Sequence, residues 1–218
     1  TSVTIPGNVT SIGESAFNAC GNLSSVTMEE GVTSLGGYAF AGCRNLTSIN
    51  IPHSVTHISS SFIDCGLTSI TIPNSVIDIG GPTFIGCNAL TSIVVESDNP
   101  KYDSRSNCNA IIETASNALV AGCKNTIIPN SVTSIAAEAF NGRKGLTSID
   151  IPNKVISVGY QSFAGCTDLT SINLGEGVTD IAVLAFNGCT SLTSVTIPNA
   201  VTNIGESAFG GCSSLTAI

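Results

Sequence analysis

One apolar pattern recurs from one end of the chain to the other. Each copy begins with a leucine, continues with alternating aliphatic and small polar residues, and ends with a phenylalanine and a cysteine, as in residues 192–214. The leucines that begin the copies are Leu23, Leu46, Leu67, Leu90, Leu146, Leu169, Leu192 and Leu215, and most of them are 23 residues apart. A fixed period of this length is typical of a solenoid, in which each copy forms one turn and stacks on the next.

The residues within one copy predict the elements of one turn. Residues 192–197 alternate apolar with polar and are rich in β-branched side chains, which favours a strand, and Pro198 ends it. Residues 201–204 form a second extended stretch, Gly205 turns the chain, and residues 206–209 suit a short helical turn. We therefore predict an α/β repeat solenoid of 23-residue units, with parallel β-strands and short helical or 3-10 turns.

Phenylalanine and cysteine are each confined to one phase of the repeat, which predicts columns of like side chains inside the stack. All eight phenylalanines occupy their phase, namely Phe17, Phe40, Phe62, Phe84, Phe140, Phe163, Phe186 and Phe209. Seven of the nine cysteines occupy theirs, and Arg143 stands where one more would be. Stacked cysteines have parallel Cβ vectors, which is poor geometry for a disulfide, so we expect buried free thiols.

The consensus LTSIxIPxSVTxIGxxAFxGC resembles the leucine-rich repeats of the BspA-like surface proteins, also called the Treponema pallidum type. The resemblance covers nearly all 218 residues, and the Pro, Phe and Cys phases all agree with it. It implies a leucine-rich repeat stack of right-handed turns, in a secreted or surface-anchored protein of host-associated microbes. Better-known members are linked to adhesion to host matrix proteins or to other microbes. Binding residues are not shared across that family, so the resemblance assigns none here.

The repeat is irregular over residues 97–125. Asp98, Asn99 and Pro100 indicate a turn, and two short apolar runs at 110–113 and 118–121 flank a loop, so we predict a β-hairpin within this unit. The family resemblance supports the hairpin, because BspA-like arrays often carry an NPxYxS hairpin unit. The alternative is a disordered linker between two arrays. Cys108 and Cys123 could close a loop over this insert, although the sequence alone fixes no pairing.

We expect residues 1–218 to form a single array that is a fragment of a longer protein. The chain begins inside a repeat and stops at Ile218, early in another, and no polar capping unit is evident. We expect this array to be a monomer.

The composition excludes some partners. The chain is 42% hydrophobic and only 10% charged, it has no tryptophan, and its net charge is −8. Its seven lysines and arginines are scattered, so no nucleic acid is expected as a partner. No run of 18 apolar residues occurs, so we expect no membrane insertion of this fragment.

The outward positions of the first strand form a candidate partner-binding face. If the leucine and the two following aliphatics point inward, the residues two and four positions after each leucine point outward. The candidate face comprises Ser48, Asn50, Ser69, Thr71, Ser148, Asp150, Ser171 and Asn173. Solenoids use such surfaces for extended contacts with a protein or a glycan. The alternative is that serine and threonine here serve only strand pairing and solubility.

Residues that depart from the consensus are candidates for specific contacts. We single out Tyr38, His53, His57 and Tyr160, with sequence drift at tolerant positions as the alternative. His53 and His57 are the only histidines, and too few other ligands are near in sequence for a metal site. No nucleophile motif and no phosphate-binding loop is present, so we expect no catalytic residues and no cofactor.

The pattern and the resemblance together lead to a functional hypothesis. We expect a non-enzymatic, extracellular or cell-surface adhesion and recognition module that binds host matrix proteins, other microbial surfaces or a glycan. The alternative is a structural spacer or stalk within a larger surface protein.

Overall fold

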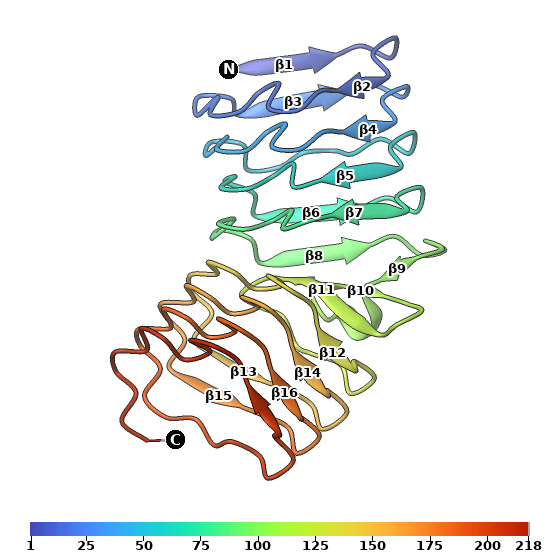
Figure 1. The fold of residues 1–218 in the computed structure, drawn as a ribbon. Helices are drawn as coiled ribbons and strands as arrows, with labels where there is room; N and C mark the ends of the chain where they lie inside the picture. The colour runs from blue at the N-terminus through green and yellow to red at the C-terminus, as the bar shows by residue number, and fades with distance from the viewer. Residues whose placement is uncertain (218) are drawn as a thin grey trace. The chain divides into compact units, whose positions relative to one another are not determined.

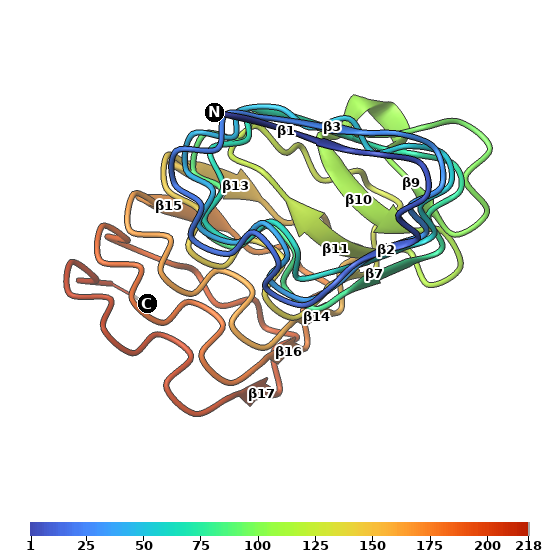
Figure 2. The same ribbon diagram turned by 90° about the horizontal axis from the view of Figure 1, so that it is seen from above.

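The computed structural model describes residues 1–217, which divide into a first unit, Thr1–Asp103, and a second unit that begins at Ser104. Ile218, the last member of the predicted aliphatic row, lies outside the described residues. Each unit is a stack of similar turns (Figure 1). Figure 2 looks along the stack of the first unit, and the traces of its turns nearly superimpose.

The first unit contains parallel sheets in which each strand pairs with its counterpart in the next turn. The register is Val3 with Val26 in one sheet and Ile70 with Ile93 in another, so like residues lie side by side as the period predicts. The sheets are β1–β3, β6–β8 and β2–β4–β5–β7. Their strands are β1 (Ser2–Ile5), β2 (Ser11–Ile12), β3 (Ser25–Met28), β4 (Ser34–Leu35), β5 (His57–Ser59), β6 (Ser69–Ile72), β7 (Asp78–Gly80) and β8 (Ser92–Val95), and β9 (Tyr102–Asp103) follows them.

The second unit begins with the predicted hairpin and continues with regular turns. β10 (Ala110–Glu113) and β11 (Ala118–Gly122) pair antiparallel, with residues 114–117 between them. β11 then pairs in parallel with β12, the first of the regular strands, which continue the sheet in the order β12–β14–β16–β17. The regular strands are β12 (Ser134–Ile135), β13 (Ser148–Asp150), β14 (Ser157–Val158), β15 (Ser171–Asn173), β16 (Asp180–Ile181) and β17 (Asn203–Ile204).

The segments predicted as helical turns are not helical in the described residues. In seven of the eight turns that carry a phenylalanine, the residue two positions before it has a positive φ, as at Ser15 (57°) and Glu138 (60°). In the turn of Phe84, the positive φ is at Gly81 (62°), three positions before the ring. That left-handed conformation breaks an α-helix after a single residue. The backbone N–H groups donate to the next turn instead, as Phe17 does to the carbonyl of Ala39 at 2.7 Å. The short helix present, a 3-10 helix, is η1 (Arg105–Asn107) in the insert.

The phenylalanine column is confirmed as the centre of each unit's core. Consecutive rings lie nearly parallel, with centroids 4.9 Å apart for Phe140 and Phe163 and 5.2 Å apart for Phe163 and Phe186. Phe40, Phe62, Phe140, Phe163 and Phe186 have no exposed surface. Such contacts between neighbours, repeated at every turn, give most of the stability of a solenoid.

The cysteine column is confirmed as a row of free thiols. Six of the seven column thiols, all except Cys20 in the first turn, donate to a phenylalanine carbonyl of the preceding turn, as Cys166 Sγ does to Phe140 O at 3.1 Å. Cys108 and Cys123 are also buried free thiols, so the structure forms no disulfide over the insert. Arg143 fills the cysteine position of its turn and is only 1% exposed, which excludes it as a surface contact.

Threonine hydroxyls form hydrogen bonds between neighbouring turns. In five turns the threonine directly after the leucine donates through Oγ1 to the carbonyl of its counterpart in the preceding turn, as Thr170 does to Thr147 at 2.9 Å and Thr91 to Thr68 at 3.0 Å. Ser24 makes the same bond to Thr1 through its Oγ, so the position uses a hydroxyl donor.

Candidate functional site

The candidate binding surface is the first-strand face of each unit, at the point where the ladder of parallel strands is interrupted. In the first unit, residues 48–51 form no strand and make no hydrogen bond to β6. In the second unit, residues 127–130 form no strand and make no hydrogen bond to β13. A shallow hollow opens beside each of these segments, because no continuous ladder closes the face there.

The hollow of the first unit, which we call hollow A, has a volume of about 280 Å³. Four of the predicted face residues, Ser48, Asn50, Ser69 and Thr71, line it. Aliphatic residues and Pro73 form the rest of its wall, and His53 and Glu96 stand at its end.

The hollow of the second unit, hollow B, has a volume of about 490 Å³. Three of the predicted face residues, Ser148, Asp150 and Asn173, line it, and the amides of Asn130 and Asn153 add to them. Ile127, which is 74% exposed, stands beside these polar groups. Ser171, on β15, does not line the hollow. The eight predicted face residues are therefore divided between two corresponding surfaces, one in each unit.

The eight face side chains are exposed and available to a partner. None of them takes part in a hydrogen bond in the described chain, whereas the neighbouring threonines are occupied by the ladder. A hydroxyl that already bonds to the protein would have to break that bond before it could bind a partner. A hydroxyl without such a bond only replaces its hydrogen bond to water with one to the partner. Availability distinguishes these rows from the threonine row that directly follows the leucines.

The predicted variable contacts are not gathered at one place. His53 lies at hollow A, whereas His57 lies on β5, where its Nδ1 is 2.7 Å from Thr56 Oγ1. Tyr38 and Tyr160 are 47% and 45% exposed and lie in the turns that precede the phenylalanines of their separate units. The structure therefore brings one of these four residues to the candidate surface.

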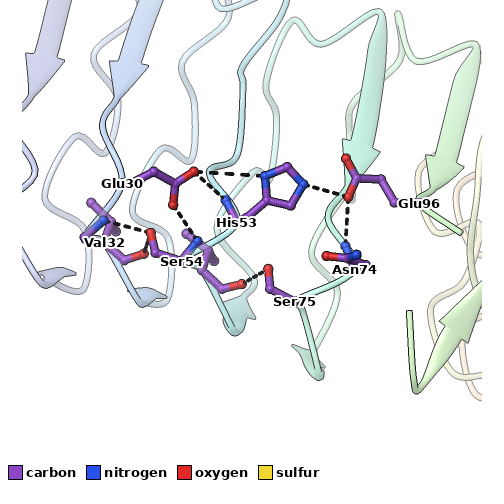
Figure 3. Close-up of polar contacts among 9 residues, drawn as sticks. Glu30, Val32, His53, Ser54, Asn74, Ser75 and Glu96 are labelled. Carbon is purple, nitrogen blue, oxygen red and sulfur yellow. Dashed lines mark hydrogen bonds and ion pairs between the residues drawn. The ribbon is translucent and has the colours of Figure 1, made fainter. Parts of the chain in front are cut away.

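His53 lies between two carboxylates that the sequence analysis did not single out. Its Nε2 is 2.9 Å from Oε2 of Glu96, and its Nδ1 is 4.0 Å from Oε1 of Glu30 (Figure 3). Glu30, His53 and Asn74 occupy the same phase in successive turns, and Glu96 reaches back across the turn of Asn74. The shared phase of Glu30 and His53 was a readable signal, but the reach of Glu96 depends on side-chain geometry.

Backbone N–H groups fix both carboxylates. Glu30 accepts from the N–H groups of His53 at 3.1 Å and Ser54 at 2.9 Å, and Oε2 of Glu96 accepts from Asn74 N–H at 3.0 Å. These bonds, led by the one from His53, lower the pKa of Glu30, since they favour its charged form. The side chains beside hollow A are therefore anchored rather than mobile.

No group of three or more histidine, cysteine or acidic side chains in residues 1–217 is arranged to hold a metal ion. Burial raises the pKa of Cys43 to about 11 and that of Cys166 to about 12, so these two thiols remain protonated and poorly nucleophilic. Across the same residues, no helix has both the length and the apolar character that a membrane span requires.

Solved structures of similar fold include a pneumococcal vaccine antigen and two bacterial leucine-rich proteins. The pneumococcal vaccine antigen PcpA superposes with a TM-score of 0.82 at 21% identity, over 98% of this chain and 60% of PcpA, so this chain spans less than two thirds of PcpA. A leucine-rich cell surface protein from Faecalibacterium prausnitzii superposes with a TM-score of 0.60 at 29% identity, over 100% of this chain and 78% of that protein. A leucine-rich repeat protein from Eubacterium ventriosum gives 0.55 at 23% identity, over 99% and 83%.

The comparison with curated proteins returns no significant match. The comparison with family profiles matches the BspA-type leucine-rich repeat region, in six copies, over residues 1–113 and 111–218. These two matches together span the whole chain and agree with the period, the stacked turns and the solved structures. The chain therefore belongs to the family of BspA-type leucine-rich repeat proteins.

Proposed function

We propose that this chain is a non-enzymatic adhesion and recognition module that binds a partner through its first-strand face. The observation that carries the proposal is the availability of the predicted face side chains that line hollows A and B, since none of these serine, threonine, asparagine and aspartate side chains has a hydrogen bond within residues 1–217. Membership in a repeat family whose fold presents extended surfaces supports the same conclusion.

We place the module outside the cell, at a cell surface, with a protein of the host matrix or of another microbe, or a glycan, as its partner. The similarity to a protein named as a leucine-rich cell surface protein supports this location. The partner contact would be extended and of modest affinity, because the face lacks the tryptophan, tyrosine and arginine side chains that usually dominate binding energy. We expect the module to act as a monomer, which light scattering would test.

Binding of the purified protein to immobilised fibronectin and to whole host cells tests the proposal. Ser69→Trp and Ser148→Trp would place a large ring over hollow A and hollow B respectively, since both serines face outward on their strands. Ser11→Trp, on the exposed position of β2, is the matched control. We expect at least one of the two hollow variants to weaken saturable binding by about tenfold, the loss typical of an important contact, and the control to bind normally.

Equal binding by both hollow variants and the parent protein would refute the assignment of the face. The absence of saturable binding to any host or microbial surface would instead favour the second candidate, a structural spacer. One observation supports that candidate: within each unit, neighbouring regular turns are joined by backbone hydrogen bonds and, at most turns, by threonine and thiol hydrogen bonds, which would stiffen each unit without any partner.

A further inference from the structure

The negative charge of the chain is unevenly distributed. The first unit contains eight acidic and two basic residues, a net charge of −6, whereas the second contains seven acidic and five basic residues. Three of the acidic side chains of the first unit, Glu29, Glu30 and Glu96, belong to the segments that follow its first strands. A cationic partner would therefore be attracted to the first unit in preference to the second.

Glu96 presents one unoccupied carboxylate oxygen at hollow A. Its Oε2 accepts from Asn74 N–H and faces His53 Nε2, while its Oε1 has no hydrogen bond within residues 1–217. The side chain is 33% exposed, so a ligand can reach it and solvent only partly screens its charge. The backbone bond and the histidine fix the carboxylate in place, which lowers the entropy that binding would cost.

The remaining groups of hollow A suit a cation with several donors. A lysine ammonium has three N–H donors and no acceptor, and an arginine guanidinium has five donors. Hollow A supplies the Glu96 carboxylate, the Asn50 amide oxygen and the hydroxyls of Ser48, Ser69 and Thr71 as acceptors, with aliphatic walls for the methylene stem. Its volume of about 280 Å³ is small for a whole ligand but ample for one side chain.

We propose that hollow A is a subsite for a lysine or arginine side chain of an extended protein partner, and that His53 controls its occupancy. This inference rests on the proposed function, and it names the partner chemistry of the first-strand face. The cation pairs with Oε1 of Glu96 and bonds to the neighbouring hydroxyl and amide oxygens, while the partner backbone lies along the open segment 48–51.

His53 couples this subsite to pH. Two titratable groups face His53, namely Glu96 at 2.9 Å and Glu30 at 4.0 Å. The carboxylate of Glu29, beside Glu30, points instead to the preceding turn, where it accepts a hydrogen bond from Gly7 N–H. A proton gained by His53 adds a positive charge between the two carboxylates and neutralises the site that the partner cation needs. Binding of a basic segment is therefore weaker when His53 carries the additional proton than when its ring is neutral.

The experiment is an NMR titration of the whole isotopically labelled chain with blocked hexapeptides of alternating alanine and lysine. Peptides with glutamine or glutamate in place of lysine are the matched probes. We expect the lysine peptide to shift the resonances of Asn50, Ser69 and Thr71, and to bind about two- to fivefold more tightly than the glutamine peptide, the range that one exposed ion pair supplies. Equal affinity for the three peptides would overturn the proposal.

Two variants, each with a matched control variant, assign the lysine preference and its pH dependence to named residues. Glu96→Gln removes the charge and should abolish the preference for lysine, whereas Glu206→Gln, which removes an exposed acid in the second unit, should leave it unchanged. His53→Asn should abolish the loss of affinity at low pH, whereas His57→Asn should retain it. A lysine preference that persists in Glu96→Gln, or a pH response that persists in His53→Asn, would each contradict the proposal.

The outcome is separable from that of the proposed function. If the charge series fails while Ser69→Trp or Ser148→Trp still weakens adhesion, the first-strand face binds by other chemistry and only the cation subsite is wrong. If the charge series succeeds while both tryptophan variants adhere normally, the subsite exists and the adhesion assignment is wrong.

Discussion

The column thiols act as hydrogen-bond donors in this fold. From the second turn of each column onward, the thiol donates to a phenylalanine carbonyl, as Cys189 Sγ does to Phe163 O at 3.2 Å and Cys87 Sγ to Phe62 O at 2.8 Å. Desolvation raises the pKa of Cys166 and Cys189, so these thiols keep the proton that makes the bond. A serine would make the same bond at a greater desolvation cost, which accounts for cysteine at this position.

Thiol labelling of the native protein should distinguish the end of the column from its interior. Cys20 is exposed and Cys212 is partly exposed, whereas the other seven cysteines are buried. We expect an aromatic disulfide reagent at neutral pH to modify Cys20 rapidly, Cys212 more slowly, and the rest only after denaturant is added. Cys20→Ser should remove the fast phase alone. Rapid reaction of three or more thiols would show that the column is not inside the stack.

The lowered pKa of Glu30 makes a prediction about acid stability. Its carboxylate is bound by N–H groups in the native chain, so its contribution to stability is present above the ordinary glutamate pKa of about 4.3. That contribution is lost as the pH falls through the lowered native pKa. Glu30→Gln should therefore unfold at a lower temperature than the parent near pH 7, and the gap should narrow toward about pH 3. Thermal unfolding followed by circular dichroism measures both, and a gap that is constant with pH would contradict the argument.

Among the elements, the segment that ends the first unit depends on one asparagine. The side-chain nitrogen of Asn99 donates to the carbonyls of Pro73 and Val76, both at 2.9 Å, and its oxygen accepts from the N–H groups of Lys101 and Tyr102. The asparagine thereby joins this segment to the turn before it. This geometry gives a structural reason for the asparagine in the NPxYxS motif.

Asn99→Ala should remove all four of these bonds at once. Several partners would be left unsatisfied in a partly buried place, so we expect a loss of about 2–4 kcal/mol in the free energy of unfolding. Asn74→Ala is the control, since the side chain of Asn74 is exposed and makes no hydrogen bond in the described chain. Denaturant unfolding measures the stability of both variants. A similarly small loss of unfolding free energy in the two would mean that Asn99 does not hold this segment to the preceding turn.

The hairpin makes room for the first ring of the second phenylalanine column. A Cβ added at Gly122, on β11, would overlap the ring of Phe140, whereas one added at Gly13 would meet nothing within 4 Å. Gly122→Ala should therefore cost about 1–3 kcal/mol through overpacking, and Gly13→Ala should be close to neutral. Equal unfolding free energies for the two variants would show that Phe140 can move aside without cost.

For the whole molecule, the repeat predicted the architecture because stacking converts a sequence phase into a spatial column. The inward leucines and phenylalanines, the free thiols and the hairpin all follow from phase and length, and the structure confirms them. The predicted helical turns were wrong, because the residue with the left-handed backbone before the phenylalanine varies from serine to leucine and carries no sequence signal. The burial of Arg143 was also missed, since a break in the consensus looks the same whether the position is inside or outside.

The candidate surface was predictable only in part. The position of a residue within the repeat identified the outward rows, but all regular turns have such rows. The hollows arise only where residues 48–51 and 127–130 do not pair with the neighbouring strand. The shortened step of 21 residues between Leu46 and Leu67 is the signal for the first interruption, and the irregular insert precedes the second. The clustering of His53 with Glu96 depends on two side chains meeting across an intervening turn, which the period alone does not specify.

The linear arrangement of contacts makes a prediction about how substitutions combine. Phe163 and Phe186 stack at 5.2 Å in the second unit, whereas Phe40 stacks on Phe17 and Phe62 in the first. Each phenylalanine-to-alanine change should cost about 3–5 kcal/mol, because it opens a cavity in a closed column. In a solenoid, only neighbouring turns share contacts, so the cost of two changes should deviate from the sum only for neighbours.

Double-mutant cycles in denaturant unfolding measure this directly. Phe163→Ala combined with Phe186→Ala should show a coupling free energy of about 0.5–1.5 kcal/mol, the value of a stacked aromatic pair. Phe40→Ala combined with Phe163→Ala should be additive within about 0.5 kcal/mol, because the two rings share no partner. A coupling as large for the distant pair as for the stacked pair would mean that the chain transmits strain between its units, and the nearest-neighbour description of its stability would have to be abandoned.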